Sequence, residues 1–450
     1  KAFPMRRALT AVAASLALVG SSMLVAPAAN ADGPVSDLQF GMHIPRIAEG
    51  ERPNANIGTV RLWDAGVAWG QVQQKRNLFW WNGLDSAIQN ANAQGMSITY
   101  VLGSTPKWAQ KKKDRKKGRY PYNGTGAANP KAKDWNRWVR AVVQRYGASI
   151  DSYQIWNEAN LKDFWDGSPK QMAKLTRNAY RIIKRYDPTA TVVAASSTVR
   201  LTKSYNRFFP KYLKQLRRYG WPVDALAVHT YPRGKDTPTD RLRLLDRVNR
   251  DIRKANVPPR IELWDTEVNY GIRGPGKIKG QDIQGGQAAD WTASTFLDSI
   301  LTGVDRTYWY YWYRPDGRLG IILENTPVGT TLGGIGYQTV FDWMVGSFYT
   351  CTRGGPGQPN VCQLGDNDNP QTVVWSNEGI GTYTVPANAT VQCNSLNQCG
   401  AIAPGTQLPI GGSPLWFGSQ IAYEQLLQRQ QGNLAARTPA PPAPTPAPAG

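Results

Sequence analysis

Residues 134–160 read DWNRWVRAVVQRYGASIDSYQIWNEAN, a stretch in which an amphipathic helix leads into a buried strand. The apolar residues of its first half recur at i, i+3, i+4, i+7, i+8 and i+11, which is one face of a helix. Asp134 stands where an N-terminal cap is expected, and Gly147 stands where the helix would stop. The segment 152–156 lacks strict polar alternation, as expected of a strand covered on both faces. The stretch therefore predicts one helix–strand unit of a parallel sheet.

The same alternation extends from about residue 35 to about residue 346. Eight runs indicate strands, at 38–43, 59–63, 97–102, 152–156, 191–195, 225–229, 261–266 and 306–312. Helical stretches lie between most of them, at 84–91, 134–146, 169–186, 203–219, 237–255, 286–302 and 335–346. The link from His43 to Thr59 is too irregular to predict a helix. We therefore expect an α/β fold, a (β/α)8 TIM barrel over residues 32–349. A doubly wound open sheet is the alternative, although no G-x-G-x-x-G follows the first strand.

The first residues carry the features of an export signal. A positive region at 5–7 (MRR) precedes an apolar run at 8–25, and 29–31 (ANA) matches a small-residue cleavage site. We expect residues 1–31 to be a signal peptide cleaved after Ala31, which predicts a secreted protein. The apolar run is too interrupted for a good membrane anchor, and no other segment is apolar enough to predict a transmembrane span.

The composition changes after residue 350, where Gly, Pro, Asn and Thr increase. Short β runs at 372–375, 381–385 and 390–393 predict a small C-terminal β-domain, a β-rich accessory domain over 350–430. The Pro- and Ala-rich residues 431–450 predict a disordered tail.

The four cysteines, Cys351, Cys362, Cys393 and Cys399, all lie in this last part of the chain. Export permits disulfides, and four cysteines allow three pairings. The spacing favours Cys351–Cys362 and Cys393–Cys399, because each pair closes a short loop. Zinc is a poor alternative, since neither pair has C-x-x-C spacing and both histidines lie far away in sequence.

The formal net charge is +21, and loss of residues 1–31 would remove Lys1, Arg6 and Arg7 and leave about +18. Such a chain adheres to polyanions. After export these are anionic cell-wall polymers, acidic polysaccharides or membrane surfaces rather than nucleic acid. The basic run 111–119 (KKKDRKKGR) follows the third predicted strand, on the face of a barrel that carries the active site. It is either a solvated loop or a surface that binds an acidic polymer.

Two glutamates follow predicted strands at the ends where barrel enzymes hold their catalytic groups. Glu158 follows the fourth strand, and Glu267 ends the seventh. Cleavage of a glycosidic bond with retention needs two carboxyl groups roughly 5–5.5 Å apart, one to protonate the leaving oxygen and one to attack the anomeric carbon. Glu262 begins its strand, and Asp265 shares that strand with Glu267, so both are weaker candidates.

The motif Trp156-Asn157-Glu158-Ala159-Asn160 resembles the Trp-Asn-Glu-Pro-Asn signature of the retaining glycoside hydrolases of clan A. In that clan the acid/base ends strand four and the nucleophile ends strand seven. The surrounding residues are most similar to glycoside hydrolase family 39, which includes β-xylosidases, α-L-iduronidases and bacterial exopolysaccharide hydrolases. The resemblance covers about residues 41–343. Ala159 replaces the usual proline, and the basic run matches no signature of the clan.

The resemblance implies a role for each candidate residue. Glu158 would be the acid/base and Glu267 the nucleophile. Asn157 would hydrogen-bond the sugar 2-hydroxyl, and Arg61 would keep Glu267 ionised because a nearby cation lowers the pKa of a carboxyl group. Tyr231 would hold Glu267, and Trp312 would form the floor for a sugar ring. His229 and His43 are either substrate contacts or buried, hydrogen-bonded histidines. No metal or cofactor is implied.

The expected function is therefore a secreted retaining glycoside hydrolase that acts on a polysaccharide or oligosaccharide, with an acidic or cell-surface glycan as one substrate class. The alternative is a non-catalytic glycan- or polyanion-binding cell-wall protein on a barrel scaffold. That alternative predicts little need for Glu158 and Glu267. The sugar, the linkage and the choice between internal and terminal cleavage stay open.

Overall fold

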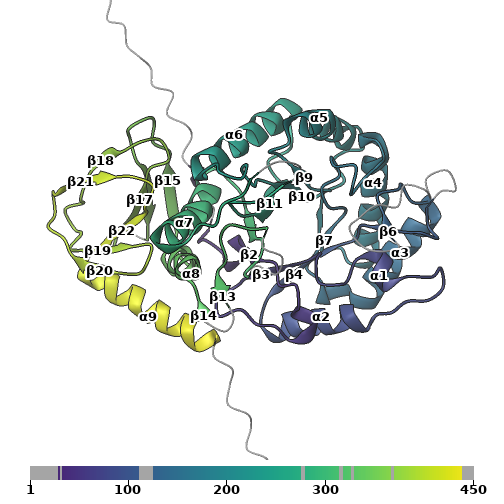
Figure 1. Cartoon of the computed structure of the whole chain (residues 1–450), viewed down its shortest axis with the longest axis horizontal. Coiled ribbons are helices and arrows are strands. Elements are labelled where there is room, and N and C mark those ends of the chain that lie inside the picture. Colours follow the sequence, from purple (N-terminus) through teal and green to yellow (C-terminus); the bar gives the residue numbers. More distant parts are fainter. Residues whose placement is uncertain are drawn as a thin grey trace, which may run out of the picture.

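The computed structural model describes residues 29–30, 33–110, 125–274, 279–313, 318–325, 329–365 and 369–437. Within these residues eight parallel strands pair in chain order and close into a barrel when the last strand pairs with the first. The strands are β2 (Phe40–Met42), β3 (Thr59–Leu62), β4 (Ser97–Val101), β7 (Ser152–Gln154), β8 (Thr191–Val193), β10 (Ala225–His229), β11 (Glu262–Val268) and β12 (Arg306–Trp309). The predicted (β/α)8 barrel is confirmed, and Figure 1 shows its helices as a ring around the strands.

The fifth strand is interrupted. After Val193 the chain leaves the sheet and returns as β9 (Ser197–Thr198), which pairs with the C-terminal end of β10. This second piece extends the barrel wall on the face where the strands end, beside His229.

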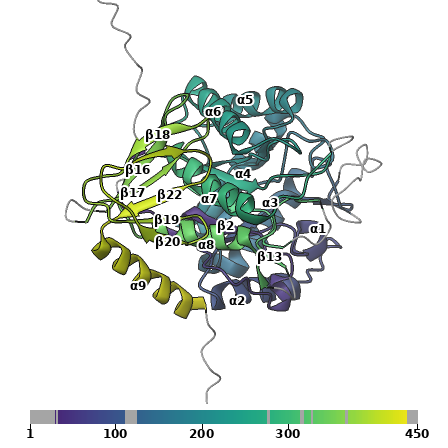
Figure 2. The same ribbon diagram turned by 60° about the vertical axis from the view of Figure 1, so that its left-hand side comes forward.

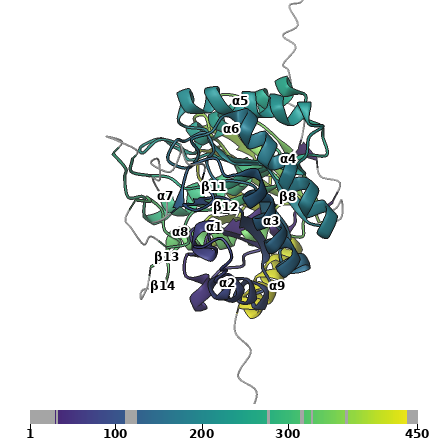
Figure 3. The ribbon, with the colours of Figure 1, turned by 90° about the vertical axis from the view of Figure 1, so that its right-hand side faces the viewer.

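The helices of the barrel lie close to the predicted stretches. They are α2 (Asn82–Ala93), α3 (Ala132–Tyr146), α4 (Pro169–Tyr186), α5 (Thr202–Arg218), α6 (Pro238–Ala255), α7 (Gly285–Leu301) and α8 (Leu332–Met344), with a short α1 (Trp69–Val72) before α2. Figure 3 shows α3, α4 and α5 in succession on the side turned away from the C-terminal domain. The irregular first link contains only a 3-10 turn at Ile47–Glu49.

The two ends of α3 test the capping predictions. The helix begins at Ala132, so the predicted N-cap at Asp134 is wrong. Asp134 lies instead in the first turn, where its buried carboxylate forms a 2.5 Å ion pair with Arg76. Gly147 does end the helix, with a φ of +43° that favours glycine.

Side chains fill the inside of the barrel below its open end. The Tyr308 hydroxyl reaches across the barrel to the hydroxyl groups of Thr59 and Thr99, at 3.1 and 2.7 Å. Its ring passes over Gly41, where an added Cβ would lie 2.6 Å from a ring carbon. Because alternate residues of a strand point to the same face, the next inward position of β3, after Thr59, is Arg61. The inward-facing side chains at the C-terminal ends of the strands, such as Arg61, therefore line the open end of the barrel.

The C-terminal domain is an antiparallel sheet that packs beside α7 and α8 (Figure 1). Its seven strands, in spatial order, are β1 (Ala29–Asn30), β15 (Tyr349–Thr352), β16 (Asn360–Leu364), β17 (Gln371–Trp375), β22 (Leu415–Gly418), β19 (Val391–Asn394) and β20 (Cys399–Ala401). A separate pair is formed by β18 (Gly381–Thr384) and β21 (Gln407–Ile410). The predicted β-domain is present, and both favoured disulfides, Cys351–Cys362 and Cys393–Cys399, are formed. Strand β1 lies upstream of the expected cleavage after Ala31, and residues 1–28 lie outside the described part of the chain.

The last helix, α9 (Gln420–Arg437), runs along the lower edge of the β-domain in Figure 2. The predicted tail boundary at 431 is therefore wrong, because residues 431–437 are helical. These residues precede the proline-rich sequence, and Asn433 donates a 2.6 Å hydrogen bond to Asp342 of α8. In the described part of the chain, no helix has the length and apolar character needed to cross a membrane.

Two short antiparallel strand pairs are also present, β5 (Thr105–Pro106) with β6 (Thr125–Gly126) and β13 (Glu324–Asn325) with β14 (Gly329–Thr330). The predicted basic run 111–119 lies outside the described residues. The β5–β6 pair brackets it, after the end of the third barrel strand.

Candidate active site

Arg61 joins several residues of the candidate site by hydrogen bonds. It lies at the end of β3 and is fully buried, with only 1 % of its surface exposed. Its Nη1 donates to Glu267 at 2.7 Å, its Nη2 to the Asn157 side-chain oxygen at 2.7 Å and its Nε to Gln154 at 2.7 Å. The guanidinium fork thus connects the ends of three strands and holds the predicted nucleophile against the Asn157-Glu158 motif.

Glu267 reaches the site because β11 bulges just before it. Trp264 packs inside the barrel with Tyr308, whereas Asp265 faces outward and pairs with Arg241 of α6 at 2.8 Å. Regular alternation would put Glu267 on the outer face with Asp265. The register against β10 shifts here, so that Val228 pairs with Asp265 and His229 with Glu267. The extra residue turns Glu267 inward, which is a common use of a bulge near an active site.

Glu158 lies just beyond the end of β7 with a φ of +38°, a left-handed backbone conformation that non-glycine residues rarely adopt. The Ser196 hydroxyl accepts a 2.8 Å hydrogen bond from the Glu158 backbone, and the Ser196 carbonyl accepts one from Ala159. These contacts, from the interruption between β8 and β9, fix the strained turn.

The pKa values of the two carboxyl groups both lie above their ordinary range. Burial raises the pKa of Glu158 to about 7, and the nearby cations Arg200 and Arg61 oppose that shift. Burial also raises the pKa of Glu267, while Arg61 favours its ionised form. Arg61 makes the predicted contact with Glu267, but the effect of burial is larger, so the net shift of the Glu267 pKa is upward. Burial, rather than the charge of Glu267, is the main cause of the Glu158 shift.

His229 lies between the two glutamates. Its Nδ1 is 3.1 Å from a Glu158 oxygen and 3.3 Å from a Glu267 oxygen. Burial lowers the pKa of His229 to about 3, so the ring is neutral and its Nδ1–H can donate to these oxygens. The three side chains present ligand atoms within 4.8 Å of one another. The two carboxylates are therefore as close as a retaining mechanism requires.

These three residues are also the group that comes nearest to a cation site among the described His, Cys, Asp and Glu side chains. Glu267 already accepts hydrogen bonds from Arg61 and from the Tyr231 hydroxyl, the latter at 2.9 Å. A fixed guanidinium 2.7 Å from one ligand oxygen repels a metal ion. The donor set fits proton transfer and nucleophilic attack better than metal binding.

The aromatic wall of the site differs in part from the prediction. The Tyr310 ring lies 4.7 Å from the ring of His43 and 6.0 Å from that of Tyr231, between centroids. His43 itself contacts Arg61 at 3.4 Å and the Thr266 carbonyl at 3.0 Å. Strand β12 ends at Trp309, before the predicted end at 312, so Tyr310 is the first residue beyond it. Trp312 is buried and makes its ring contact with Tyr313, and its role as a sugar platform stays a prediction.

The comparisons place this geometry among known folds. No family model matches the chain. A β-xylosidase of Caldicellulosiruptor saccharolyticus is 26 % identical over 121 residues, which are 25 % of this chain and 24 % of that relative. A family 39 glycoside hydrolase from the gut symbiont Bacteroides cellulosilyticus WH2 superposes with a TM-score of 0.63 at 14 % identity, over 85 % of this chain and 81 % of that chain. The chain is similar to family 39 glycoside hydrolases.

Two further solved structures extend the likeness. A monomeric β-xylosidase from Caulobacter crescentus CB15 has a TM-score of 0.61 at 16 % identity, over 86 % of this chain and 97 % of that one. A family 51 arabinofuranosidase from Xanthomonas axonopodis pv. citri has a TM-score of 0.55 at 12 % identity, over 87 % and 97 %. The predicted resemblance to clan A and to family 39 is confirmed. At these identities the solved structures establish the fold, and the matched stretch of the curated β-xylosidase spans about a quarter of its length.

Three residues of the site escaped the sequence analysis. Tyr310 was hidden in an aromatic run, Ser196 lies in the interruption of the fifth strand, and Arg200 follows β9. Arg200 stacks over the Tyr231 ring, with its guanidinium carbon 5.3 Å from the ring centroid. The signal for both Ser196 and Arg200 would have been the continuation of the fifth strand beyond residue 195.

Proposed function

We propose that the chain is a retaining glycoside hydrolase that cleaves O-glycosidic bonds by double displacement. The observation that carries the proposal is the pairing of Glu158 and Glu267 across His229, with carboxylate oxygens within 4.8 Å of each other. That separation is close to that of retaining enzymes, roughly 5–5.5 Å, and below the roughly 6.5–9.5 Å of inverting enzymes.

In the first step, Glu158 in its acid form donates its proton to the glycosidic oxygen as the bond to the anomeric carbon breaks. Glu267 attacks that carbon from the opposite face and forms a glycosyl ester. In the second step, Glu158, now ionised, removes a proton from water, which attacks the anomeric carbon and releases Glu267. The pKa of about 7 keeps a large fraction of Glu158 protonated near neutrality before the first step.

The surrounding residues support these roles. Arg61 and the Tyr231 hydroxyl each hold one oxygen of Glu267, so the attacking carboxylate cannot rotate freely. Arg61 also occupies the Asn157 side-chain oxygen, which orients the amide nitrogen of Asn157 as a donor toward a sugar hydroxyl. Glu158 keeps 13 % of its side chain exposed, against 8 % for Glu267, as suits the residue that must reach the leaving group and water.

Export and substrate class belong to the same proposal. We propose that the signal peptide at 1–31 directs the chain out of the cell and that its substrate is a polysaccharide or oligosaccharide. The two disulfides are typical of an oxidising compartment. The formal net charge of +21 favours acidic glycans and anionic cell-wall polymers as partners.

The test compares Glu158→Gln with the parent on aryl glycosides that differ in their leaving group. We expect a large loss of kcat/KM with a poor leaving group and a much smaller loss with a dinitrophenyl group, because only a basic leaving oxygen needs protonation. NMR of the first-formed sugar should show the anomeric configuration of the substrate. Equal losses on both substrates, or inverted product, would contradict the mechanism.

A further inference from the structure

Arg200 is held beside the active site by the second piece of the fifth strand. The Asn160 side chain accepts from the Thr198 backbone and donates to the Thr198 carbonyl, both at 3.0 Å. The Val199 backbone donates to the His229 carbonyl at 3.1 Å. The two residues before Arg200 are therefore both held by hydrogen bonds, and α5 begins shortly after it at Thr202.

The guanidinium of Arg200 has no hydrogen-bond partner among the described residues. Its Nε and Nη1 are buried without an acceptor, and Nη2, which also makes no hydrogen bond, keeps exposed surface. The charged and titratable groups that act on it are Glu158, Tyr231, Glu267 and Arg233, and neither glutamate lies within ion-pair distance. A buried arginine without an acceptor is costly, because each unmet donor loses its hydration.

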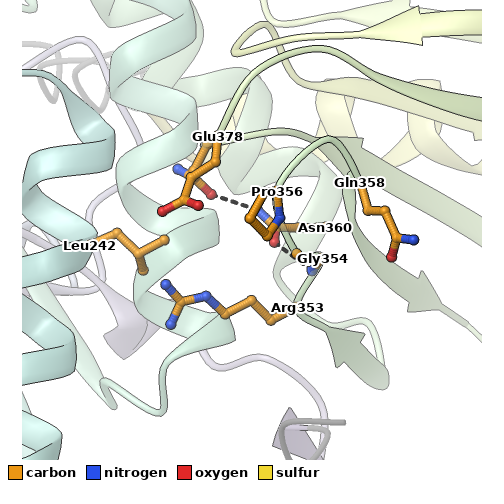
Figure 4. Close-up of a pocket in the computed structure, with 9 residues that line it drawn as sticks. Leu242, Arg353, Gly354, Pro356, Gln358, Asn360 and Glu378 are labelled. Carbon is orange, nitrogen blue, oxygen red and sulfur yellow. Dashed lines mark hydrogen bonds between the residues drawn. The ribbon is translucent and has the colours of Figure 1, made fainter. Parts of the chain in front are cut away.

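Several other arginines in the described chain, Arg61, Arg241 and Arg353 among them, are matched by acceptors, whereas Arg177 and Arg306 also have one buried nitrogen without a partner. Arg61 makes three hydrogen bonds to side chains, and Arg241 makes four. Arg353 projects into a cavity of about 210 Å³ between α6 and the C-terminal domain (Figure 4). Both of its terminal nitrogens are engaged by Asp246, at 2.5 and 2.9 Å. That cavity therefore offers no free cation, in contrast to the site beside Glu158.

We propose that Arg200 binds an anionic group, a carboxylate or a sulfate ester, on the sugar that lies beside Glu158. The planar fork of an arginine matches both groups and would place two of its free donors on one anion. The guanidinium carbon of Arg200 lies 5.3 Å from the centroid of the Tyr231 ring, whose hydroxyl holds Glu267. The inference rests on the proposed function for the identity of the ligand as a sugar, and it names the substrate class as acidic.

The chemistry of Glu158 agrees with this assignment. Arg200 lowers the pKa of Glu158, more strongly than Arg61 does, and so favours the ionised form that cannot act as an acid. An anion bound to Arg200 cancels that positive charge and lets burial keep Glu158 protonated. An acidic substrate would thereby raise the pKa of Glu158 further and increase the protonated fraction that cleavage requires, whereas a neutral sugar would leave the opposing charge in place.

The experiment measures binding of monosaccharides to the full chain by ligand-observed NMR titration. The probes are glucuronate, galacturonate and iduronate, the 6-sulfates of glucose and galactose, and the neutral sugars glucose, galactose, idose and xylose, with inorganic sulfate alone as a further probe. The proteins are the parent, Arg200→Gln, Arg200→Lys and the control Arg177→Gln. Arg177 also stacks on a tyrosine, Tyr219, and has a buried Nε without a partner, but it belongs to α4 on the outside of the barrel.

We expect at least one acidic sugar to bind the parent roughly 10- to 100-fold more tightly than its neutral counterpart. The ratio should fall to about one in Arg200→Gln, take an intermediate value in Arg200→Lys because charge without the fork remains, and persist in Arg177→Gln. The uronates and the sulfates distinguish the two kinds of anion. Tighter binding of a sugar sulfate than of inorganic sulfate ties the anion to the sugar.

Acidic sugars that bind no better than neutral ones, an absence of binding by every probe, or a ratio unchanged by Arg200→Gln would each overturn the inference. The proposed function can be overturned independently of the role of Arg200. Hydrolysis of a neutral aryl glycoside without any preference for acids would overturn the role of Arg200 and leave the hydrolase intact. If the protein prefers acidic sugars through Arg200 but hydrolyses no glycoside, the proposed hydrolase is overturned and the role of Arg200 in binding stands.

Discussion

Strand β11 carries two buried carboxylates, Asp265 and Glu267, and each is paired with a buried arginine on a different side of the barrel wall. Arg241 gives Asp265 a hydrogen bond of 2.8 Å, and Arg61 gives Glu267 one of 2.7 Å. The Asp265 side chain is fully enclosed between the sheet and α6, whereas that of Glu267 retains 8 % exposure at the open end of the barrel. Similar carboxylate–arginine pairs therefore serve packing on the outer side of the wall and, in the proposed mechanism, reaction on the inner side.

The difference comes from the neighbours of each carboxylate as much as from its position. Asp265 accepts from Arg241 and from both the backbone and the hydroxyl of Thr230, and Arg241 itself has further partners in Thr295 and Ser299. On the inner face, Glu267 also accepts from Arg61 and the Tyr231 hydroxyl and lies beside the His229 Nδ1, but it faces a second carboxyl group, Glu158, across that histidine. One bulged residue separates the two environments.

The largest effect should come from removing the inner carboxylate. We expect Glu267→Ala to reduce kcat on an activated aryl glycoside by at least about 10⁴-fold without a comparable loss of stability, because the covalent step disappears. Added azide should yield a glycosyl azide of inverted configuration, since it attacks the vacated face. Near-normal turnover by Glu267→Ala would contradict its role as nucleophile.

The outer carboxylate should show the opposite pattern. Asp265→Asn leaves Arg241 as an unpaired buried cation, so we expect a loss of about 3–5 kcal/mol in the free energy of unfolding. The double variant Asp265→Asn/Arg241→Met removes that cation and should recover part of the loss. Urea titrations of both variants measure this, and turnover per folded molecule should stay within about threefold of the parent. A double variant less stable than Asp265→Asn would show that the pair is not the source of the loss.

Much of the fold is predictable from periodicity. The eight strands and the helices around them lie close to the predicted ranges because burial on both faces of a parallel sheet leaves a plain apolar signal. The interruption between β8 and β9 has no such signal, because the small and polar residues 194–198 fit a loop as well as a strand end. The α9 boundary was missed because composition identified the proline-rich tail but could not show that the residues before it pack on α8.

The site could be predicted only as far as the motif reaches. Glu158 and Asn157 were predicted from the motif, Glu267 from strand order and Arg61 from the resemblance to the clan, and the structure brings the four together. The bulge that turns Glu267 inward is a matter of backbone register and has no mark in the sequence. For the same reason, a run of consecutive aromatic residues after residue 307 could not show that Tyr310 rather than Trp312 lies against His43.

A subtler substitution sharpens the contrast between the two arginines. Arg61→Lys keeps a positive charge but lacks the planar fork that now joins three acceptors on different sides, so Glu267 and Asn157 lose their common hydrogen-bond donor group. We expect kcat/KM on an aryl glycoside to fall roughly 100-fold. Arg241→Lys, the matched control on the outer face, should lower the melting temperature and change kcat/KM by less than about threefold. Equal losses of kcat/KM in the two variants would mean that the geometry of the inner pair depends on the outer pair.

The smallest expected effect concerns the pH dependence of kcat/KM. It tests whether the outer pair, Asp265 and Arg241, influences the pKa of Glu158 inside the barrel. The folded-state pKa of Glu158 is about 7, and the acid must be protonated, so kcat/KM on a substrate with a poor leaving group should fall about tenfold per unit above pH 7. It should fall again at lower pH, where Glu267, whose pKa is also raised, becomes protonated and can no longer attack. Asp265 is not among the groups that shift the pKa of Glu158. The double variant Asp265→Asn/Arg241→Met leaves the net charge unchanged, so its alkaline limb should superimpose on that of the parent within about 0.3 unit. A parent profile that stays flat to pH 9 would remove Glu158 as the acid, whereas a displaced limb in the double variant alone would show that the outer pair contributes to the electrostatics of the site through the barrel wall.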